Sequence, residues 1–131
     1  MTEDVRWKQR FENFKKALNL LQELAEQPVR NRAETEGMIQ RYEYTFELAW
    51  KVLGDYLQQE GVLVKSPRET IKEAFSYGII HEGTVWMDML ETRNIMSHTY
   101  DEENFNAATE KIIDIYLIEF IALKKWLLQK I

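Results

Sequence analysis

The chain has 131 residues, with 17 Lys plus Arg against 22 Asp plus Glu, so its formal net charge is −5 at pH 7. It contains no Cys, which excludes disulfides, thiolate metal sites, iron–sulfur clusters and cysteine nucleophiles. The acidic balance argues against a surface that coats nucleic acid or an anionic membrane, although it leaves room for a small basic pocket. The two histidines, His81 and His98, are too few for a His-based metal site without help from carboxylates. We therefore expect no metal and no cofactor.

A single domain over residues 1–131 is expected at this length. The first eight residues, Met1–Lys8, are acidic and lack the apolar run of a secretory signal. The most apolar stretch, Ile112–Leu123, is interrupted by Asp114 and Glu119 and is shorter than the ~20 residues of a membrane span. A cytoplasmic protein without a membrane partner is the interpretation that follows.

Two long amphipathic helices are predicted in the first half of the chain. Apolar residues recur at steps of four and three over Trp7–Ala25, which predicts a helix at residues 3–27 that ends before Pro28. A second stripe of the same kind covers Met38–Leu57, and Gly61 is placed to end its helix. A short polar segment joins the two, so they should form an antiparallel hairpin.

Three further helices are predicted in the second half. Ser66–Glu69 reads as a capping box with proline at the first helical position, and it begins a short helix that closes near Gly78. Gly83 opens the next helix, and Asp101 caps the last one. The last helix is apolar on more than one face over Ile112–Leu123, which is typical of a central helix or of one shared with a second subunit. The predicted fold class is all-α: an up-and-down four-helix bundle with an additional short helix.

The residues most suited to chemistry lie where the fourth helix gives way to the cap of the last. Arg93, His98 and Tyr100 fall within eight residues there. In an ideal helix the first two would be about 140° apart, at about 100° per residue, so they converge only if the helix unwinds near Ser97 or the Arg side chain curls round. Asn94 and His98 share a face at i, i+4.

An arginine and a histidine at one place suit metal-independent cleavage of a phosphodiester by the neighbouring 2′-hydroxyl. Arg93 would hold the phosphate with its planar charged fork, and His98 would transfer protons. One histidine cannot easily serve as both acid and base. A symmetric dimer would bring two copies together, and the apolar last helix offers a surface for it.

The plainer alternative needs no chemistry at this place. Arg93 would pair with Asp88 or Glu91, and His98 would close a helix C-terminus favourably. Spacing alone favours this alternative, because a lone Arg-x4-His pattern is weak evidence. In either case we expect the carboxylates of Asp88 and Glu91 to orient the guanidinium of Arg93.

Two carboxylates of the second predicted helix, Glu43 and Glu47, stand at i, i+4. They could be metal ligands or an acid–base pair. They flank the apolar stripe rather than pointing with it, so a solvated or interface-lining face is the favoured interpretation.

The pattern Arg93-x4-His98-x-Tyr100 resembles the Arg-x4-His-x-Tyr motif of the HEPN superfamily, and within it the nucleotidyltransferase substrate-binding proteins. The resemblance covers nearly the whole chain. Three further segments are similar to that family: Arg41–Lys51, Ser66–Phe75 and Trp86–Arg93.

The resemblance implies a HEPN-like helical bundle that forms a homodimer and acts beside a separate minimal nucleotidyltransferase. In relatives that are toxins of toxin–antitoxin pairs, the residues matching Arg93 and His98 form a ribonuclease site across the dimer. The residue matching Tyr100 is adenylylated there by the partner, which silences the nuclease. RNA or a nucleotide would then bind in a dimer cleft around Arg93, where Asn94 and Ser97 could support it.

Two hypotheses follow from the resemblance and the chemistry together. The first is an interaction module that binds a nucleotidyltransferase and helps to present its substrate. The alternative is a metal-independent endoribonuclease in which Arg93 and His98 are catalytic. A phosphate added to Tyr100 would place negative charge where an RNA phosphate should bind, so modification of this residue suits an off-switch.

Overall fold

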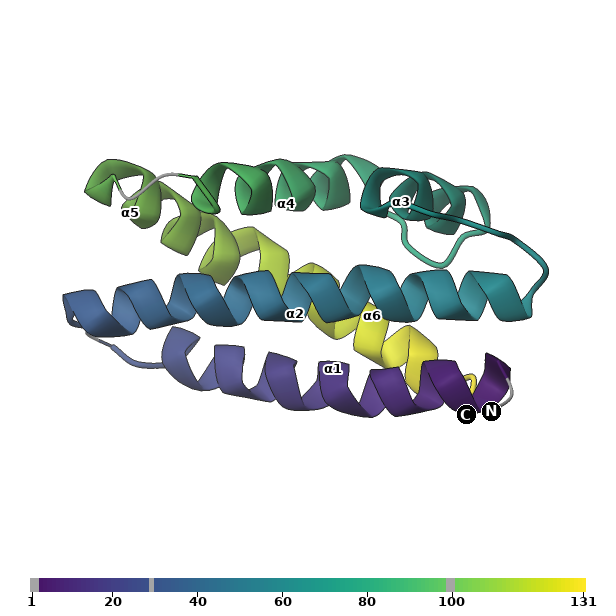
Figure 1. The fold of residues 1–131 in the computed structure, drawn as a ribbon. Coiled ribbons are helices and arrows are strands. Elements are labelled where there is room, and N and C mark those ends of the chain that lie inside the picture. The colour runs from purple at the N-terminus through teal and green to yellow at the C-terminus, as the bar shows by residue number, and fades with distance from the viewer. Residues whose placement is uncertain (1–2, 29, 99–100) are drawn as a thin grey trace.

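The computed structural model describes residues 3–28, 30–98 and 101–131, and within these ranges all regular structure is helical (Figure 1). The all-α class predicted from the sequence is therefore confirmed. The last three helical segments follow one another without a break and act as one long helix. The elements are α1 (Glu3–Ala25), α2 (Arg32–Gln59), α3 (Pro67–Ser76), α4 (Gly83–Met96), α5 (Glu102–Lys111), a π-helical turn (Ile112–Tyr116) and α6 (Leu117–Leu128).

The helix α2 runs through the middle of the bundle. It forms an antiparallel hairpin with α1 on one side and contacts α3, α4 and α5 on the other. The continuous helix from α5 to α6 crosses behind α2 and reaches α1, so the two chain ends lie near each other (Figure 1). This arrangement places the C-terminal end of α4 beside the N-terminal half of α2.

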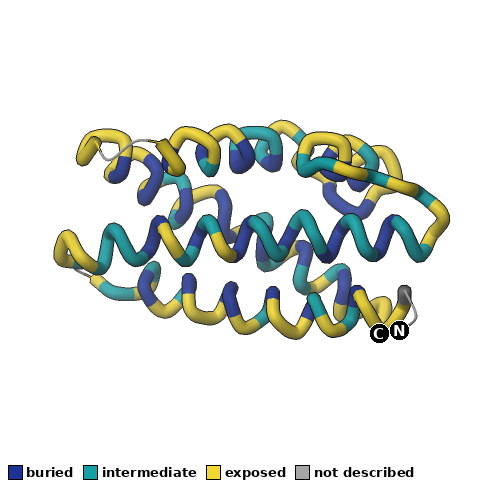
Figure 2. Tube along the Cα trace, in the orientation of Figure 1, coloured by how far each residue is buried: buried dark blue, intermediate teal, exposed yellow. Residues whose placement is uncertain are grey.

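Aromatic side chains fill the core where these helices meet, and the buried faces turn inward (Figure 2). The predicted stripes of α1 and α2 are buried from Trp7 at one end to Leu57 at the other, except that Ala25 and Trp50 are half-buried against the core. Phe120 of α6 lies among them, with its ring centroid 5.8 Å from that of Trp86 and 6.2 Å from that of Tyr42. The amphipathic periodicity therefore identified the core correctly.

The helix starts follow their capping residues, with one departure from prediction. Asn31 and Glu34 form a complete capping box at the start of α2. At α3, the Ser66 hydroxyl accepts from Glu69 N at 3.2 Å, as predicted, but the Glu69 carboxylate accepts from Lys65 N at 3.1 Å rather than from Ser66. The predicted box is therefore only half formed, because the acid reaches one residue further back.

Glycine ends two of the helices, α2 and α3. Gly61 and Gly78 both have positive φ, at 87° and 74°, and follow α2 and α3. An L side chain rarely adopts this left-handed conformation, so glycine stops both helices, as predicted. The first helix ends at Ala25, two residues short of its predicted end.

The last helix combines a core face with an exposed apolar face. Asp101 caps it by accepting from Glu103 N at 3.1 Å. The core face buries Tyr116 and Phe120, whereas Ile115, Ile118 and Leu128 are 42%, 61% and 45% exposed. The sequence left open whether its wide apolar surface meant a central helix or a shared one. Its inner half serves the core, and its outer half is uncovered in the single chain. Over the described residues, no helix is long and apolar enough to cross a membrane.

Candidate functional site at the end of helix α4

The candidate site lies where α4 ends. The helix stops at Met96, and three hydrogen bonds hold the turn that follows. The Ser97 hydroxyl and Ser97 N both donate to Arg93 O, at 2.9 Å and 3.1 Å, and His98 N donates to Ile95 O at 3.1 Å. His98 is exposed beyond the helix. The α-helix therefore ends before His98, but Ser97 keeps helical φ and ψ of −67° and −18°, and no hydrogen bond joins the side chains of Arg93 and His98 within the described part of the chain.

Arg93 is held by a carboxylate from another helix. Its Nη2 donates to Glu47 Oε2 of α2 at 2.5 Å, and its Nη1 donates to Asn94 Oδ1 at 3.1 Å. Lys51 approaches the second oxygen of Glu47 at 3.3 Å. The side chains of Arg93 and Glu47 are 28% and 31% exposed, so the pair is largely shielded from water. An anion that binds Arg93 must therefore compete with a carboxylate already in place.

The structure corrects the expectation that Asp88 and Glu91 orient the guanidinium. Asp88 instead accepts from the Tyr116 hydroxyl at 2.5 Å and from Lys111 Nζ at 3.3 Å, both on the last helix. Glu91 is exposed and makes no hydrogen bond to Arg93. The physical reason is helical geometry: these acids point to sides of α4 other than the side that faces α2.

Two tyrosines of the predicted apolar segments, Tyr42 and Tyr116, form hydrogen bonds to α4 just before the site, and we call this pair the tyrosine clamp. The Tyr42 hydroxyl donates to Met89 O at 2.6 Å, and the Tyr116 hydroxyl also bonds Thr92 Oγ1 at 2.8 Å. The two phenol rings stack with centroids 5.5 Å apart. Burial, and then the neighbouring Asp88, raise the pKa of Tyr116 well above its ordinary value, so the clamp stays protonated. Sequence reasoning missed this network because it joins residues of three separate helical segments, α2, α4 and the π-helical turn, whose packing is not visible in the sequence.

The pKa values of two acids of α2, Glu43 and Glu47, are shifted in opposite directions. Partial burial raises the pKa of Glu43, and the charge of Arg93 only partly offsets it. Burial acts in the same direction on Glu47, but Trp50, Lys51 and Arg93 outweigh it and lower the pKa of this carboxyl. The Glu47 carboxylate, bound to Arg93, therefore resists protonation, whereas Glu43 takes up a proton more readily.

A cavity of about 300 Å³ opens between α2 and the end of α4, next to Glu43. Its α2 wall carries two carboxylates, Glu36 and Glu43, so a neutral or donor-bearing group suits its interior better than a phosphate does. Over the described residues, no three metal-ligating side chains gather at this place or elsewhere. The cavity is lined by Glu36, Ile39, Gln40, Glu43, Met96, Ser97 and Phe105.

Tyr100, the residue implied as a modification target, lies outside the described residues. On its two sides, His98 and Asp101 are both exposed. Of the predicted site residues within the described ranges, Glu47, Asn94 and Ser97 contact Arg93, whereas Asp88 and Glu91 do not. Sequence reasoning had included Glu47 as a supporting residue without naming its partner.

Comparisons with known proteins agree with this picture. Residues 9–129 match the model of the family described as nucleotidyltransferase substrate binding protein like. A Haemophilus influenzae protein named probable ribonuclease HepT is 33% identical over 99 residues, which are 72% of this chain and 67% of that protein. A crystal structure of a Thermus thermophilus protein is similar with a TM-score of 0.76 at 32% identity, over 89% of this chain and 97% of that one.

A further solved structure connects the fold with a role. It is a Haemophilus influenzae protein described as having the fold of a substrate binding domain of a nucleotidyltransferase. Its TM-score is 0.67 at 26% identity, over 95% of this chain and 97% of that one. The family match covers most of the chain, and it confirms the resemblance carried by the Arg-x4-His-x-Tyr segment. The chain therefore belongs to the family of nucleotidyltransferase substrate-binding-protein-like proteins.

Proposed function

We propose that this protein is a dimeric binding module that associates with a separate minimal nucleotidyltransferase and helps to present its substrate. The observation that carries this proposal is the match of residues 9–129 to the family described as nucleotidyltransferase substrate binding protein like, and the ion pair between Arg93 and Glu47 indicates which group would contact a phosphate. A guanidinium has five N–H donors, and Glu47 and Asn94 accept from only two of its nitrogens. The remaining donors can bind a phosphate group, while Glu47 keeps that binding moderate and reversible.

The exposed apolar face of the last helix supports the dimer. Ile115, Ile118 and Leu128 are large apolar side chains at the surface of one helix. Ile115 and Ile118 lie within one helical turn of each other, and Leu128 lies about 15 Å further along the helix. Neighbouring exposed apolar side chains such as the first two are typical of protein interfaces. A two-fold dimer through this face would be self-complementary, because the same patch meets its own copy.

Co-purification tests the binding role. The tagged chain is co-expressed with a minimal nucleotidyltransferase from the same genome, and the eluate is analysed for both proteins. We expect both proteins in the eluate. A transferase that is well expressed but never retained by the tagged chain contradicts the proposal.

The second candidate function is a metal-independent endoribonuclease. The observation that favours it is the end of α4 at Met96, which releases His98 from the helix that carries Arg93. A phosphate would have to draw the guanidinium away from Glu47, and the second His98 of a dimer would supply the missing acid or base. Nucleotidylation of Tyr100 would then block the phosphate position.

An RNA cleavage assay in EDTA distinguishes the two functions. Wild type is compared with His98→Ala and Arg93→Ala, and Arg68→Ala, at an exposed arginine of α3, is the matched control. Cleavage that is lost in the first two variants and kept in the control supports the enzyme. Equal background in all four proteins contradicts the enzyme and leaves the binding role.

A further inference from the structure

Within the described part of the chain, Glu47 is the acid that meets two cations. Its Oε2 accepts from Arg93 Nη2 of α4, and Lys51 Nζ, one turn further along α2, lies 3.3 Å from its Oε1. In every other ion pair of the described residues, one acid meets one cation. The Glu47 carboxylate therefore lies between an arginine and a lysine that come from two different helices.

The position of this carboxylate suits an anion, and dissolved molecules can reach it. Burial raises the pKa of Glu47, but Trp50, Lys51 and Arg93 together lower it below its ordinary value, so the surroundings favour a negative group there. The side chains of Lys51 and Arg93 are 40% and 28% exposed. A phosphate accepts the same charge-assisted hydrogen bonds as a carboxylate. It can therefore take the place of the Glu47 carboxylate when that side chain turns toward solvent.

Competition with Glu47 selects among phosphates by their charge. A phosphodiester carries a single negative charge, as the carboxylate does, but the carboxylate is already held in position by its own helix. A phosphate monoester carries about −1.5 to −2 at pH 7 and interacts more strongly with two cations. Glu43, the other acid near Arg93, forms no salt bridge within the described residues, so its repulsion acts from further away. The monoester is therefore the phosphate that displaces Glu47 most effectively.

We propose that Lys51 and Arg93 together bind a phosphate monoester, and that Glu47 is the internal competitor which this phosphate displaces. The proposed function, on which this site rests, supplies Arg93 as a phosphate contact, and Lys51 is the second phosphate-binding residue. A monoester is present in a free mononucleotide and at the phosphorylated end of an RNA. An internal phosphodiester of RNA should bind more weakly than either of them.

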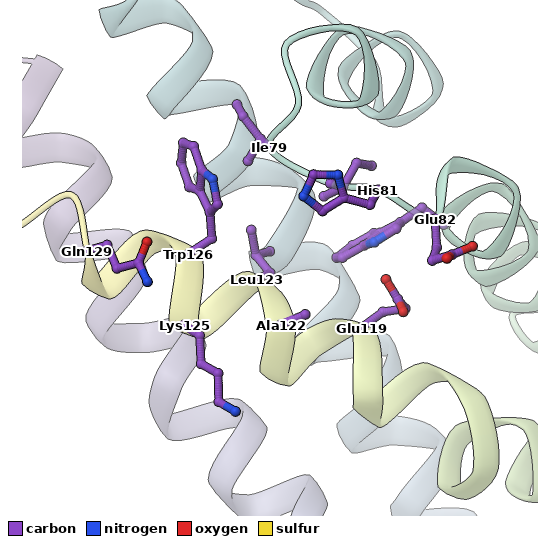
Figure 3. Close-up of a pocket in the computed structure, with 11 residues that line it drawn as sticks. Ile79, His81, Glu82, Glu119, Ala122, Leu123, Lys125, Trp126 and Gln129 are labelled. Carbon is purple, nitrogen blue, oxygen red and sulfur yellow. The ribbon is translucent and has the colours of Figure 1, made fainter.

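The cavity at the other end of α4 does not offer the same charges. It lies between the α3–α4 loop and α6 and has a volume of about 380 Å³. Figure 3 shows Glu119 pointing into this cavity and Lys125 pointing away from it. Glu82 also lines it, so the charges at the cavity are mainly carboxylates, which disfavour a phosphate. A phosphate probe should therefore bind at Lys51 and Arg93 rather than here.

Titration of the purified chain with AMP, cyclic AMP and adenosine tests the charge preference. The three ligands share a base and a sugar but carry a phosphate monoester, a phosphodiester and no phosphate. Each is added to about 10 mM, and ¹⁵N correlation spectra give the dissociation constants, with the Arg93 Nε–H resonance as the reporter. A short oligoribonucleotide with a 5′-phosphate is then compared with AMP. A dissociation constant about tenfold lower for the oligonucleotide points to an RNA end, and equal constants point to a free nucleotide.

Substitutions test the part played by Lys51. Lys51→Gln removes its charge and should raise the dissociation constant of AMP about tenfold, whereas Lys51→Arg keeps a cation and should change it by less than about threefold. Lys8→Gln is the matched control and should leave it unchanged, because Lys8 pairs with Asp4 at i, i+4 and is 38% exposed. Glu47→Gln should lower the dissociation constants of AMP and cyclic AMP by a similar factor, since both displace the same carboxylate.

We expect AMP to bind about tenfold more tightly than cyclic AMP, and adenosine to leave the Arg93 resonance unmoved. The proposal is overturned if AMP does not bind, or if cyclic AMP or adenosine binds as tightly as AMP. It is also overturned if Lys51→Gln binds AMP as wild type does, if Lys51→Arg binds no better than Lys51→Gln, or if Glu47→Gln leaves the constants unchanged. Binding that is lost in Arg93→Gln but kept in Lys51→Gln would remove Lys51 from the site and leave Arg93 as its phosphate contact. The proposed function fails on a different result, the absence of the transferase from the eluate of the wild-type chain.

Discussion

Arg93 of α4 and Glu47 of α2 are 46 residues apart in the chain, yet their Nη2 and Oε2 atoms lie 2.5 Å apart. This ion pair ties the end of α4 to the central helix of the bundle. It also means that the cation best suited to bind a phosphate already has an anionic partner in its own chain. The pair therefore sets both the orientation of the guanidinium and the strength of any anion binding there.

Replacing Glu47 should destabilise the bundle and leave Arg93 without its carboxylate partner. In Glu47→Gln we expect a loss of about 1–2 kcal/mol in the free energy of unfolding, because a largely shielded, charge-assisted bond becomes a neutral one. The same variant should bind short RNA or phosphate more tightly, because the competing anion is gone. Urea denaturation and a binding titration measure the two effects.

Glu43→Gln is the matched control for that experiment. The pKa of Glu43 is raised, so its ionised form is disfavoured in the folded state. Removing that charge should leave stability unchanged or increase it at neutral pH. A loss equal to that of Glu47→Gln would mean that the pairing with Arg93 has no special role.

The contribution of Glu47 should also depend on pH. Its folded-state pKa lies below the ordinary 4.5, so the folded protein holds this carboxyl deprotonated more strongly than the unfolded chain does. The stabilisation is complete above the unfolded-state pKa and is lost as pH falls through the folded value. The difference in unfolding free energy between wild type and Glu47→Gln should therefore be constant from about pH 7 to 5.5 and shrink below about pH 4. A difference that grows on acidification contradicts this sign.

The tyrosine clamp on α4 should matter for stability. Tyr116→Phe removes the hydrogen bonds to Asp88 and Thr92 and leaves a buried threonine hydroxyl without this partner. We expect a loss of about 2–3 kcal/mol, seen as a melting temperature lower by roughly 5–10 °C. Tyr44→Phe, at a tyrosine that is 58% exposed, should change the melting temperature little. Equal melting of the two variants would show that the clamp adds nothing.

The exposed face of the last helix should hold the dimer. Ile118→Lys places a charge at the centre of this face and should raise the dissociation constant of the dimer at least tenfold, about 1.4 kcal/mol or more. Leu63→Lys, at an equally exposed apolar residue in the α2–α3 loop, is the control. Sedimentation velocity over a range of concentrations measures both. Dimers that tolerate Ile118→Lys as well as Leu63→Lys would place the interface elsewhere.

The helices were predictable because their signals are local. Stripes such as Trp7–Ala25 repeat with the helical period, and residues such as Ser66, Gly61 and Asp101 carry the chemistry of helix ends. The capping box of Asn31 is an equally local signal, but it was not predicted, because it lies seven residues before the apolar stripe that indicated the second helix.

The partners within the site were not predictable because they depend on how helices cross. Nothing local distinguishes Glu47 from Glu91 as the partner of Arg93; the packing of α2 against α4 decides it. The π-helical turn at Ile112–Tyr116 has no signature in its own residues, yet its last residue, Tyr116, is the one that reaches Asp88. Sequence reasoning therefore named Asp88 and Glu91 as the carboxylates that orient Arg93, whereas in the structure Glu47 does so.

The most direct test of the binding role is the mass of the complex formed with a minimal nucleotidyltransferase, measured by light scattering after gel filtration of the co-expressed proteins. We predict one peak that contains both proteins, with two copies of this chain. If association requires the dimer, Ile118→Lys should replace this peak with separate peaks for the two proteins. A wild-type chain that elutes apart from a folded transferase, at the mass of a single copy, would contradict the account.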